Sequence, residues 1–569
     1  MTIKTTLLGG AALGVLLATA SGLGAEAKTR HHHVERAAPA GPSVQSEIAE
    51  LRAQVEALKA RSDAEASTQS QAQAQLATVQ TQLADAQALA RGQQAKLDEQ
   101  IQTLPATVDT RVATLLPKTD KLYIKGVTLA FGGFVAAESV TRSRNEEADL
   151  ASSFSGIPFP NSVLGRTSES RLSARQSRVS GLVQGQISPT LLASAYAEVD
   201  FLGAAQTANS NETNSYNPRL RVFYTTLDYE TSFGGIHFLS GQNWSLATLN
   251  SKGISPRNEV PPPTIDAQYV PGFVFTRQPQ ARVAIDFNNT FWAAASIENP
   301  QTTYFNSGKY LPTIAPNQPI TVFTNGAAGS GFNSANTLSV NRYPDVIGKL
   351  AFEKNIAGHQ FHLEGFGIYR DFYARVNQGS GPRNINVAAG GFGGGMTLQV
   401  VPKLLDIQAS GIIGRGIGRY GASLLPDATF GPDGSLKPVS ESAFLVGGTL
   451  HIGKALDIYA FGGEERERQT AYSVGTVYNG VGNPNYDNTG CETEAATNCV
   501  GNTHYVEQIT GGFWDRPYVG KFGRVQFGVQ YSYTERHAFP GFGVLGAAGN
   551  PAPVARENMI LTSVRYYPF

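Results

Sequence analysis

The sequence predicts an all-β transmembrane antiparallel barrel of about sixteen strands, preceded by a periplasmic α-helical coiled coil. Three observations favour this fold class: segments of alternating polar and apolar residues, connections that are long and short in turn, and an N-terminal heptad pattern. Only 16 % of the residues are charged, and Gly (61), Tyr (22) and Phe (29) are abundant. The mean hydropathy of −0.18 suits strands that are apolar on one side only. The 45 basic and 45 acidic residues balance, so nucleic acid is not an expected partner.

Residues 1–27 have the features of a secretory signal peptide: one positive charge, a short apolar core and small residues at its end. Cleavage after Ala20 and cleavage after Ala27 both fit this pattern. The alternative is an uncleaved anchor helix, which the short core disfavours because it cannot span a membrane. Residues 28–43 follow as a flexible segment. Its three histidines, His31–His33, are adjacent in a flexible chain, so no specific metal site is expected there.

Residues 44–104 are rich in Ala, Gln and Glu and repeat apolar residues at a 3-4 spacing. This heptad pattern predicts a coiled coil, because only a repeat of about 3.5 residues keeps one seam facing a partner helix. The alternative is a single amphipathic helix folded onto another domain. Leu51 and Leu58 occupy one seam position, and the β-branched residues Ile48 and Val55 occupy the other. This choice favours trimers or tetramers over dimers.

Residues 105–120 form a linker, and residues 121–569 read as strands that follow one another without a long helix. Two segments, 525–533 and 193–201, alternate cleanly between apolar residues and polar or acidic ones. Because successive side chains of a strand point to opposite faces, this alternation indicates one apolar face and one wet face. A soluble β-sandwich shows the same alternation, so the connections must decide between the two folds.

The connections alternate between tight turns and long loops, as they do in outer-membrane barrels. Sixteen strands are expected, although eighteen also fit, and they begin near residues 122, 168, 190, 218, 234, 273, 289, 345, 358, 385, 404, 441, 455, 504, 520 and 556. An even count places both termini in the periplasm of a Gram-negative bacterium, together with the stalk. The chain ends on Phe569, with another aromatic residue, Tyr567, two positions earlier, which resembles the barrel-assembly signature. Arg565 departs from that signature, which usually has an apolar residue there.

Arg171 and Arg175 share one face of a predicted strand, and a one-residue bulge near Gln176 would bring Arg178 to the same side. An arginine that faces lipid near the membrane centre costs roughly 2–4 kcal/mol, so all three are expected to face the lumen. Guanidinium groups pair bidentately with carboxylates and phosphates, which makes the row a candidate anion track. The alternative is structural: the arginines brace a loop that folds into the barrel.

Residues 247–271 join the fifth and sixth predicted strands, the place where a constriction loop commonly enters the lumen of such barrels. Within this loop, Glu259 and Asp266 are candidates to face the arginine wall. Further lumen candidates, whose strand phase the sequence does not fix, are Arg277, Arg282, Arg219 and Arg221.

The two cysteines, Cys491 and Cys499, are expected to form a disulfide in an outer loop, because export leads to an oxidising compartment. They are too few for a structural zinc site. Residues 416–421 match a GxGxxG pattern, but no βαβ unit surrounds them, so nucleotide binding is not expected. No GxSxG, HExxH or CxxC motif is present, and neither an enzyme activity nor a cofactor is predicted.

Several segments resemble the DcaP-like family of trimeric outer-membrane porins. The resemblance covers most of 121–569 and is carried by residues 171–178 (RLSARQSR), 241–245 (GQNWS), 277–280 (RQPQ), 414–421 (GRGIGRYG) and 565–569 (RYYPF). It implies a homotrimer that passively admits small, preferentially anionic solutes, with dicarboxylates as the named class. Loop 469–503, which contains both cysteines, is not part of the family pattern.

The sequence therefore predicts an outer-membrane porin without covalent chemistry. Its expected partners are two further copies of the chain, outer-membrane lipid and lipopolysaccharide, the barrel-assembly machinery and, through the stalk, the cell wall. Two alternatives stay open. One is a closed barrel that tethers the outer membrane to the cell wall, and the other is a barrel lipid hydrolase with a Ser–His pair at its rim.

Overall fold

The computed structural model describes residues 122–203, 209, 211–214, 216–305, 320–327, 337–378, 381–475, 477–541 and 552–569, together with scattered positions between 49 and 88. The chain divides into two compact units, Met1–Leu115 and Leu116–Phe569. Each unit is described by itself.

In the first unit, residues 51–64 form a helix whose side chains are exposed. The predicted signal peptide (1–27), flexible segment (28–43) and linker (105–120) lie outside the described residues, as does most of the predicted coiled coil (44–104). Within the described part of the chain, no helix is long and apolar enough to cross a membrane.

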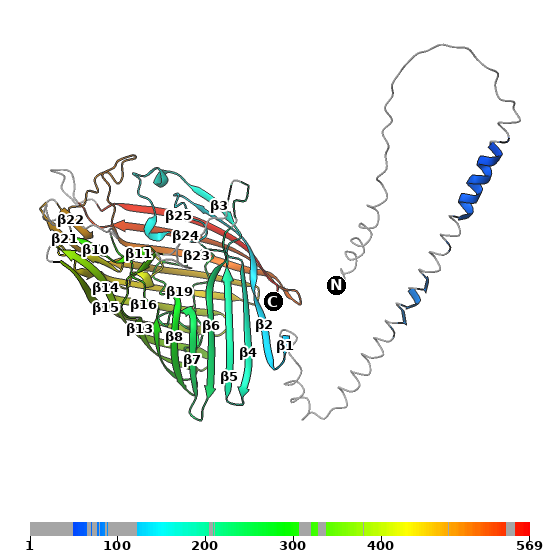
Figure 1. Cartoon of the computed structure of the whole chain (residues 1–569), viewed down its shortest axis with the longest axis horizontal. Coiled ribbons are helices and arrows are strands. Elements are labelled where there is room, and N and C mark those ends of the chain that lie inside the picture. The colour runs from blue at the N-terminus through cyan, green and yellow to red at the C-terminus, as the bar shows by residue number, and fades with distance from the viewer. Residues whose placement is uncertain are drawn as a thin grey trace, which may run out of the picture. The chain divides into compact units, whose positions relative to one another are not determined.

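The second unit is a closed antiparallel barrel of sixteen strands, as predicted (Figure 1). The first strand, β2, pairs with the last, β25, and this pairing closes the ring. The barrel strands are β2 (Val127–Arg142), β4 (Arg178–Ser188), β5 (Leu191–Asp200), β6 (Arg219–Glu230), β7 (Gly235–Trp244), β8 (Arg277–Phe287), β9 (Phe291–Glu298), β13 (Asp345–Ile356), β14 (His359–Gln378), β15 (Gly381–Val401), β16 (Leu405–Arg415), β19 (Ser440–Ile452), β20 (Leu456–Glu467), β23 (Thr503–Gly520), β24 (Gly523–Ala538) and β25 (Val554–Tyr567).

Shorter elements complete the unit. Three of them extend the barrel sheet: β1 (Leu122–Ile124), β3 (Glu169–Ser173) and β10 (Thr321–Phe323). Three small hairpins form in the loops: β11 (Asn325–Ala327) with β12 (Thr337–Ser339), β17 (Ala428–Phe430) with β18 (Leu436–Pro438), and β21 (Thr470–Val474) with β22 (Val477–Val481). The described 3-10 helices are η1 (Phe154–Gly156), η2 (Val163–Arg166) and η4 (Gly418–Tyr420).

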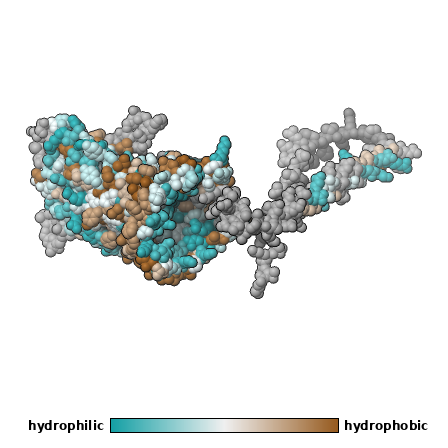
Figure 2. All heavy atoms as spheres, turned by 90° about the horizontal axis from the view of Figure 1, so that it is seen from below, coloured by the Kyte–Doolittle hydropathy of each residue, from teal (hydrophilic) through white to brown (hydrophobic). Residues whose placement is uncertain are grey.

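The strands are apolar outside and polar inside. On β24, Gln530 and Ser532 are fully buried in the interior, whereas Phe527 and Tyr531 on the opposite face are exposed. Figure 2 shows apolar residues over much of the outer wall and hydrophilic residues in a hollow on the same view. An apolar wall around a polar interior is the arrangement of a barrel that faces lipid.

The two ends of the barrel differ, and we call them the turn end and the loop end. The connections at the turn end are tight, as at Asn288 and Asn289, whose φ angles of 51° and 53° fit a type I′ hairpin turn. The connections at the loop end are mostly long, and we call them L1 (143–168), L2 (201–218), L3 (245–276), L4 (299–344), L6 (416–439), L7 (468–502) and L8 (539–553). The exception is the hairpin of β14 and β15, whose strands have 20 and 21 residues. The tenth strand therefore begins at Gly381, before the predicted position 385.

Candidate functional site

L3 joins the fifth and sixth barrel strands, β7 and β8, and folds into the barrel interior. Its residues Ile265, Val270 and Phe273 are fully buried and pack with side chains of L1 and the distant strands β20, β23 and β25. The backbone N–H of Ile265 donates to Gln530 Oε1 on β24 (2.5 Å), and that of Gly272 donates to Glu465 Oε1 on β20 (2.7 Å). L3 therefore crosses the interior from β7 and β8 to the part of the wall that contains β20 and β24, and it narrows the interior.

The bulge predicted near Gln176 is confirmed. Ser173 pairs with Glu138 and Arg178 pairs with Phe134, so four residues, 174–177, lie opposite three residues of β2. The extra residue places Arg178 on the inward face, as the sequence pattern required. Arg171 also lies on the inward face of β3, but near the loop end, where its side chain is 48 % exposed and its Nε is 3.3 Å from Glu169 Oε2.

Arg175 lies in the break between β3 and β4 and contacts loops instead of a free passage. Its Nη1 is 2.8 Å from Asp149 Oδ2 in L1, and its Nε and Nη2 donate to the carbonyls of Phe201 and Gly203 in L2. Its guanidinium also lies 3.2 Å from the ring centroid of Tyr216. All three nitrogens of this guanidinium have a described partner, so Arg175 connects L1 with L2.

The arginines of β4 and β6 form a network with two acidic residues of β5. Arg221 bonds Glu198 (2.6 Å) and Asp200 (2.9 Å), and Arg219 bonds Asp200 through both Nε and Nη2. Arg178 is more loosely held, with its Nη1 3.5 Å from Glu198 Oε1.

Arg277 and Arg282 on β8 are not ion-paired with any described residue. The Arg277 guanidinium lies 5.0 Å from the ring centroid of Trp244. Arg282 is buried and donates to Gln280 Oε1 and to the carbonyl of Trp244 (2.7 Å). Both arginines thus hold the residues at which L3 leaves β7.

The two acidic candidates of L3 have different surroundings. The carboxylate of Asp266 accepts a hydrogen bond from the Ser152 hydroxyl of L1 (2.6 Å), and Asp266 lines the same cavity as Arg178. Glu259 lies in the part of L3 that pairs with Asn250, and Asn243 donates to its carboxylate at 3.5 Å. Among the described ion pairs, neither residue bonds Arg171, Arg175 or Arg178 directly.

A cavity of about 320 Å³, which we call the basic cavity, lies between L3 and the turn end of the barrel. Its walls include five arginines against three aspartates: Arg178, Arg221, Arg516, Arg524, Arg565, Asp200, Asp266 and Asp457. Trp244, Trp514 and the proline run of L3 complete the wall.

Sequence reasoning missed three of the cavity arginines. Arg516 pairs with Asp457, and Arg565 pairs with Glu138 (2.8 Å) while it stacks on Trp514. Arg524 stacks on Tyr567 at 4.0 Å, and no ion pair is found for it within the described residues. The signal that could have located Arg524 is the clean alternation of its strand, which places it on the same face as Gln526 and Gln530.

A second cavity of about 320 Å³ meets the basic cavity beneath L3, where the two share Pro261, Pro263 and Asp457. Its other charged residues are mixed: Glu353, Lys354, His362, Asp406 and His451. His451 lies between two carboxylates, 2.7 Å from Asp457 and 3.3 Å from Asp406. Of these two cavities, the basic cavity therefore has the larger share of arginines, and most of them come from β4, β6, β24 and β25.

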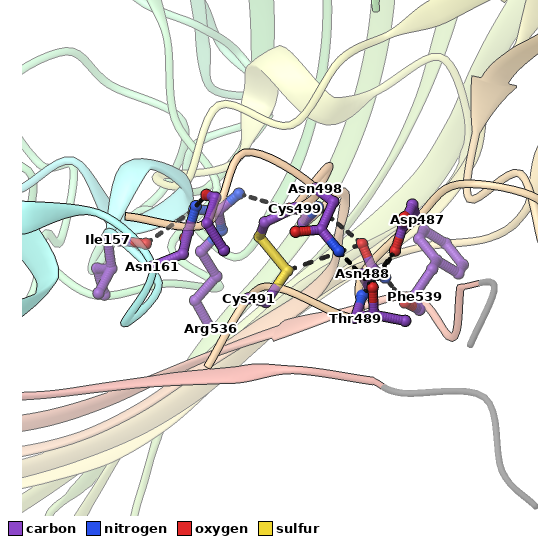
Figure 3. The surroundings of a disulfide bond; sticks show 12 residues. Ile157, Asn161, Asp487, Asn488, Thr489, Cys491, Asn498, Cys499, Arg536 and Phe539 are labelled. Carbon is purple, nitrogen blue, oxygen red and sulfur yellow. Dashed lines mark hydrogen bonds between the residues drawn. A yellow bond between two sulfur atoms is a disulfide. The ribbon is translucent and has the colours of Figure 1, made fainter. Parts of the chain in front are cut away.

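Cys491 and Cys499 form a disulfide in L7 (Figure 3). Asn488 beside it donates to the carbonyl of Phe539, and Asn161 of L1 donates its backbone N–H to the carbonyl of Cys491 (2.9 Å). The disulfide segment is thus attached to L1 and to the start of L8 at the loop end.

An apolar outer wall around a polar interior defines the class of transmembrane β-barrels. No protein-family model and no curated protein sequence matches the chain. Among solved structures, the outer membrane channel DcaP of Acinetobacter baumannii has a TM-score of 0.51 at 17 % identity, over 78 % of this chain and 99 % of that one. The chain therefore has the DcaP channel fold, and the resemblance predicted from the sequence is confirmed at that level.

Two other similar structures are more distant. The anion-selective porin from Comamonas acidovorans has a TM-score of 0.41 at 10 % identity and covers 78 % of this chain and 99 % of its own. The OmpT outer membrane protein of Vibrio cholerae has a TM-score of 0.38 at 11 % identity, with 79 % and 100 % covered.

Proposed function

We propose that this chain is an outer-membrane diffusion porin that favours small anionic solutes such as dicarboxylates. The observation that carries the proposal is the basic cavity beneath L3, which is lined by five arginines, one of which, Arg524, has no acidic partner among the described residues. An excess of positive charge in a narrow polar passage raises the local concentration of anions and opposes cations.

The interior arginines differ in whether their guanidinium groups are available to bind a solute. Arg175 and Arg219 are held by acidic residues and carbonyls, so they stabilise the wall. Arg524 has no described acidic partner, and Arg178 is 3.5 Å from the one it shares. These two are our candidates for the residues that attract a carboxylate. Both can offer a guanidinium fork to it.

The test is ion selectivity in planar bilayers under a salt gradient, with the double variant Arg178→Ala, Arg524→Ala. We expect the reversal potential to move towards cation preference at 0.1 M salt, where the Debye length is about 10 Å, and to move much less at about 1 M. Uptake of a dicarboxylate into proteoliposomes should fall more than uptake of a neutral sugar of similar size.

The double variant should fold, because it leaves no acid unpaired: Glu198 keeps Arg221 and the Tyr196 hydroxyl (3.1 Å). The matched control is Arg171→Ala, which removes one inward arginine outside the basic cavity and should leave selectivity close to wild type. If the double variant keeps wild-type selectivity at low salt, the basic cavity does not select anions and the proposal is wrong.

We further propose that the chain is a homotrimer in the outer membrane. After removal of the signal peptide, its predicted stalk (44–104) extends into the periplasm, and the loop end of the barrel faces outside. The even number of strands supports this orientation, because it places both ends of the barrel unit on the turn side. No covalent reaction is part of the proposed function.

A further inference from the structure

The outer wall of the barrel has an apolar groove over β6, β7, β8, β9 and β13. It is an open groove with a volume of about 490 Å³. Its floor is formed by small outward-facing residues and its sides by larger apolar ones: Ser240, Ala281 and Ala295, then Leu227, Phe238, Val283 and Ile297.

The groove continues towards the loop end into a more polar cavity of about 460 Å³, with which it shares Ala281 and Ile297. Arg342 and Tyr343 of L4 line this upper cavity, and both are exposed. Arg342 donates to the Tyr343 hydroxyl (2.6 Å) and stacks on that ring at 4.6 Å. Within the described residues no carboxylate forms an ion pair with Arg342, so its guanidinium is available to an external anion.

The lengths of β8 and β9 place the Arg342 guanidinium near the edge of the hydrocarbon core of the membrane. β8 has 11 residues and β9 has 8. Because a tilted strand of about 9–11 residues crosses the hydrocarbon core, the loop ends of β8 and β9 lie near the headgroups. Arg342 stands just beyond those ends, directly above an apolar groove.

We infer that the groove and Arg342 together form a binding site for a phosphate-bearing lipid of the outer leaflet, with an acyl chain in the groove and the phosphate on Arg342. The inference rests on the proposed outer-membrane location. Lipid tails are as apolar as the groove, so the groove selects shape and supplies little net free energy. The contact between Arg342 and the phosphate is expected to retain the lipid, because a guanidinium group can donate two parallel hydrogen bonds to phosphate oxygens.

The test is native mass spectrometry of protein extracted in mild detergent, with lipid A as the probe. Wild type should retain it, and Arg342→Gln should lower the retained fraction about fivefold, the effect of one exposed charge contact. Ala295→Trp, which fills the groove, should lower it as well. The matched controls are Arg556→Gln and Ala460→Trp, an exposed arginine and an exposed alanine elsewhere on the outer wall. Both controls should retain lipid as wild type does.

Two results would overturn the inference. One is lipid retention unchanged by both Arg342→Gln and Ala295→Trp. The other is loss of the oligomer on Ala295→Trp with lipid retention unchanged, which would show that a second copy of the chain occupies the groove. Both substitutions face away from the lumen, so channel conductance should stay at wild type. A wild-type protein that retains lipid A but conducts no ions would contradict the proposed function and leave this site in place.

Discussion

Replacing Arg175 with Ala distinguishes two roles of this residue: a structural brace between loops and a part of the anion path. Arg175 is 10 % exposed and its partner Asp149 is 18 % exposed. Removing one member of a buried pair costs about 3–5 kcal/mol, because the other charge is left unpaired. Asp149 retains some solvent and the Ser173 hydroxyl (3.0 Å), so we take the lower end, about 3 kcal/mol. Every 1.4 kcal/mol is tenfold, so opening of L1 should become about a hundredfold more frequent.

Hydrogen exchange measured on peptides from L1 reports this opening directly. Protection of residues 145–155 should fall by about the same factor in the variant, since exchange follows the population of the open loop. The control is Arg171→Ala: Arg171 is 48 % exposed and Glu169 keeps its ion pair with Arg142 (2.9 Å), so the loss should be at most about 1 kcal/mol. L1 should then lose no more than about fivefold of its protection. Unchanged exchange in the Arg175 variant, combined with a shifted reversal potential, would contradict the reasoning and make Arg175 part of the anion path.

Three further predictions concern other parts of the chain. Thiol labelling of Cys491 and Cys499 should fail until reductant is added, and reduction should speed proteolysis of L7 while heat-modifiable mobility of the barrel stays unchanged. Gly272→Ala should loosen L3 and raise single-channel conductance, because Gly272 has φ +93° and an added Cβ would clash with the Phe444 carbonyl; unchanged conductance would show that L3 tolerates the change. Deletion of 28–105 should weaken trimers without abolishing them in native electrophoresis, and monomeric full-length protein would refute the trimer.

The sequence was sufficient for the architecture because alternation and connection length are local properties. The count of sixteen strands, the alternation of tight turns with long loops and the bulge that turns Arg178 inward all depend on a few neighbouring residues. Arg565 is another local case. It is unusual in the barrel-assembly signature, but the alternation of its strand places its side chain in the barrel interior, where it forms an ion pair with Glu138.

The composition of the basic cavity could not be predicted in the same way. Arg178 on the second strand meets Arg516 and Arg524 on the fourteenth and fifteenth only because the ring closes, and no local pattern reports that closure. Arg175 was expected beside Arg171 by residue spacing, but the strand breaks after Ser173 and Arg175 contacts the loops instead. The path of L3 is equally non-local, since its course depends on acceptors such as Glu465 on a distant strand.

The pairing of β2 with β25 also dictates an order of events. Where the ring closes, the Ser139 and Thr562 hydroxyls are 2.6 Å apart although they are separated by 423 positions. Contacts between such remote residues form late, because the entropy of closing a long chain segment must be lost first. Until synthesis and export have delivered the fourteen residues of β25, both edge strands have unpaired backbone groups that can recruit other chains. A chain cut short before β25 should therefore aggregate, however intact its remaining strands.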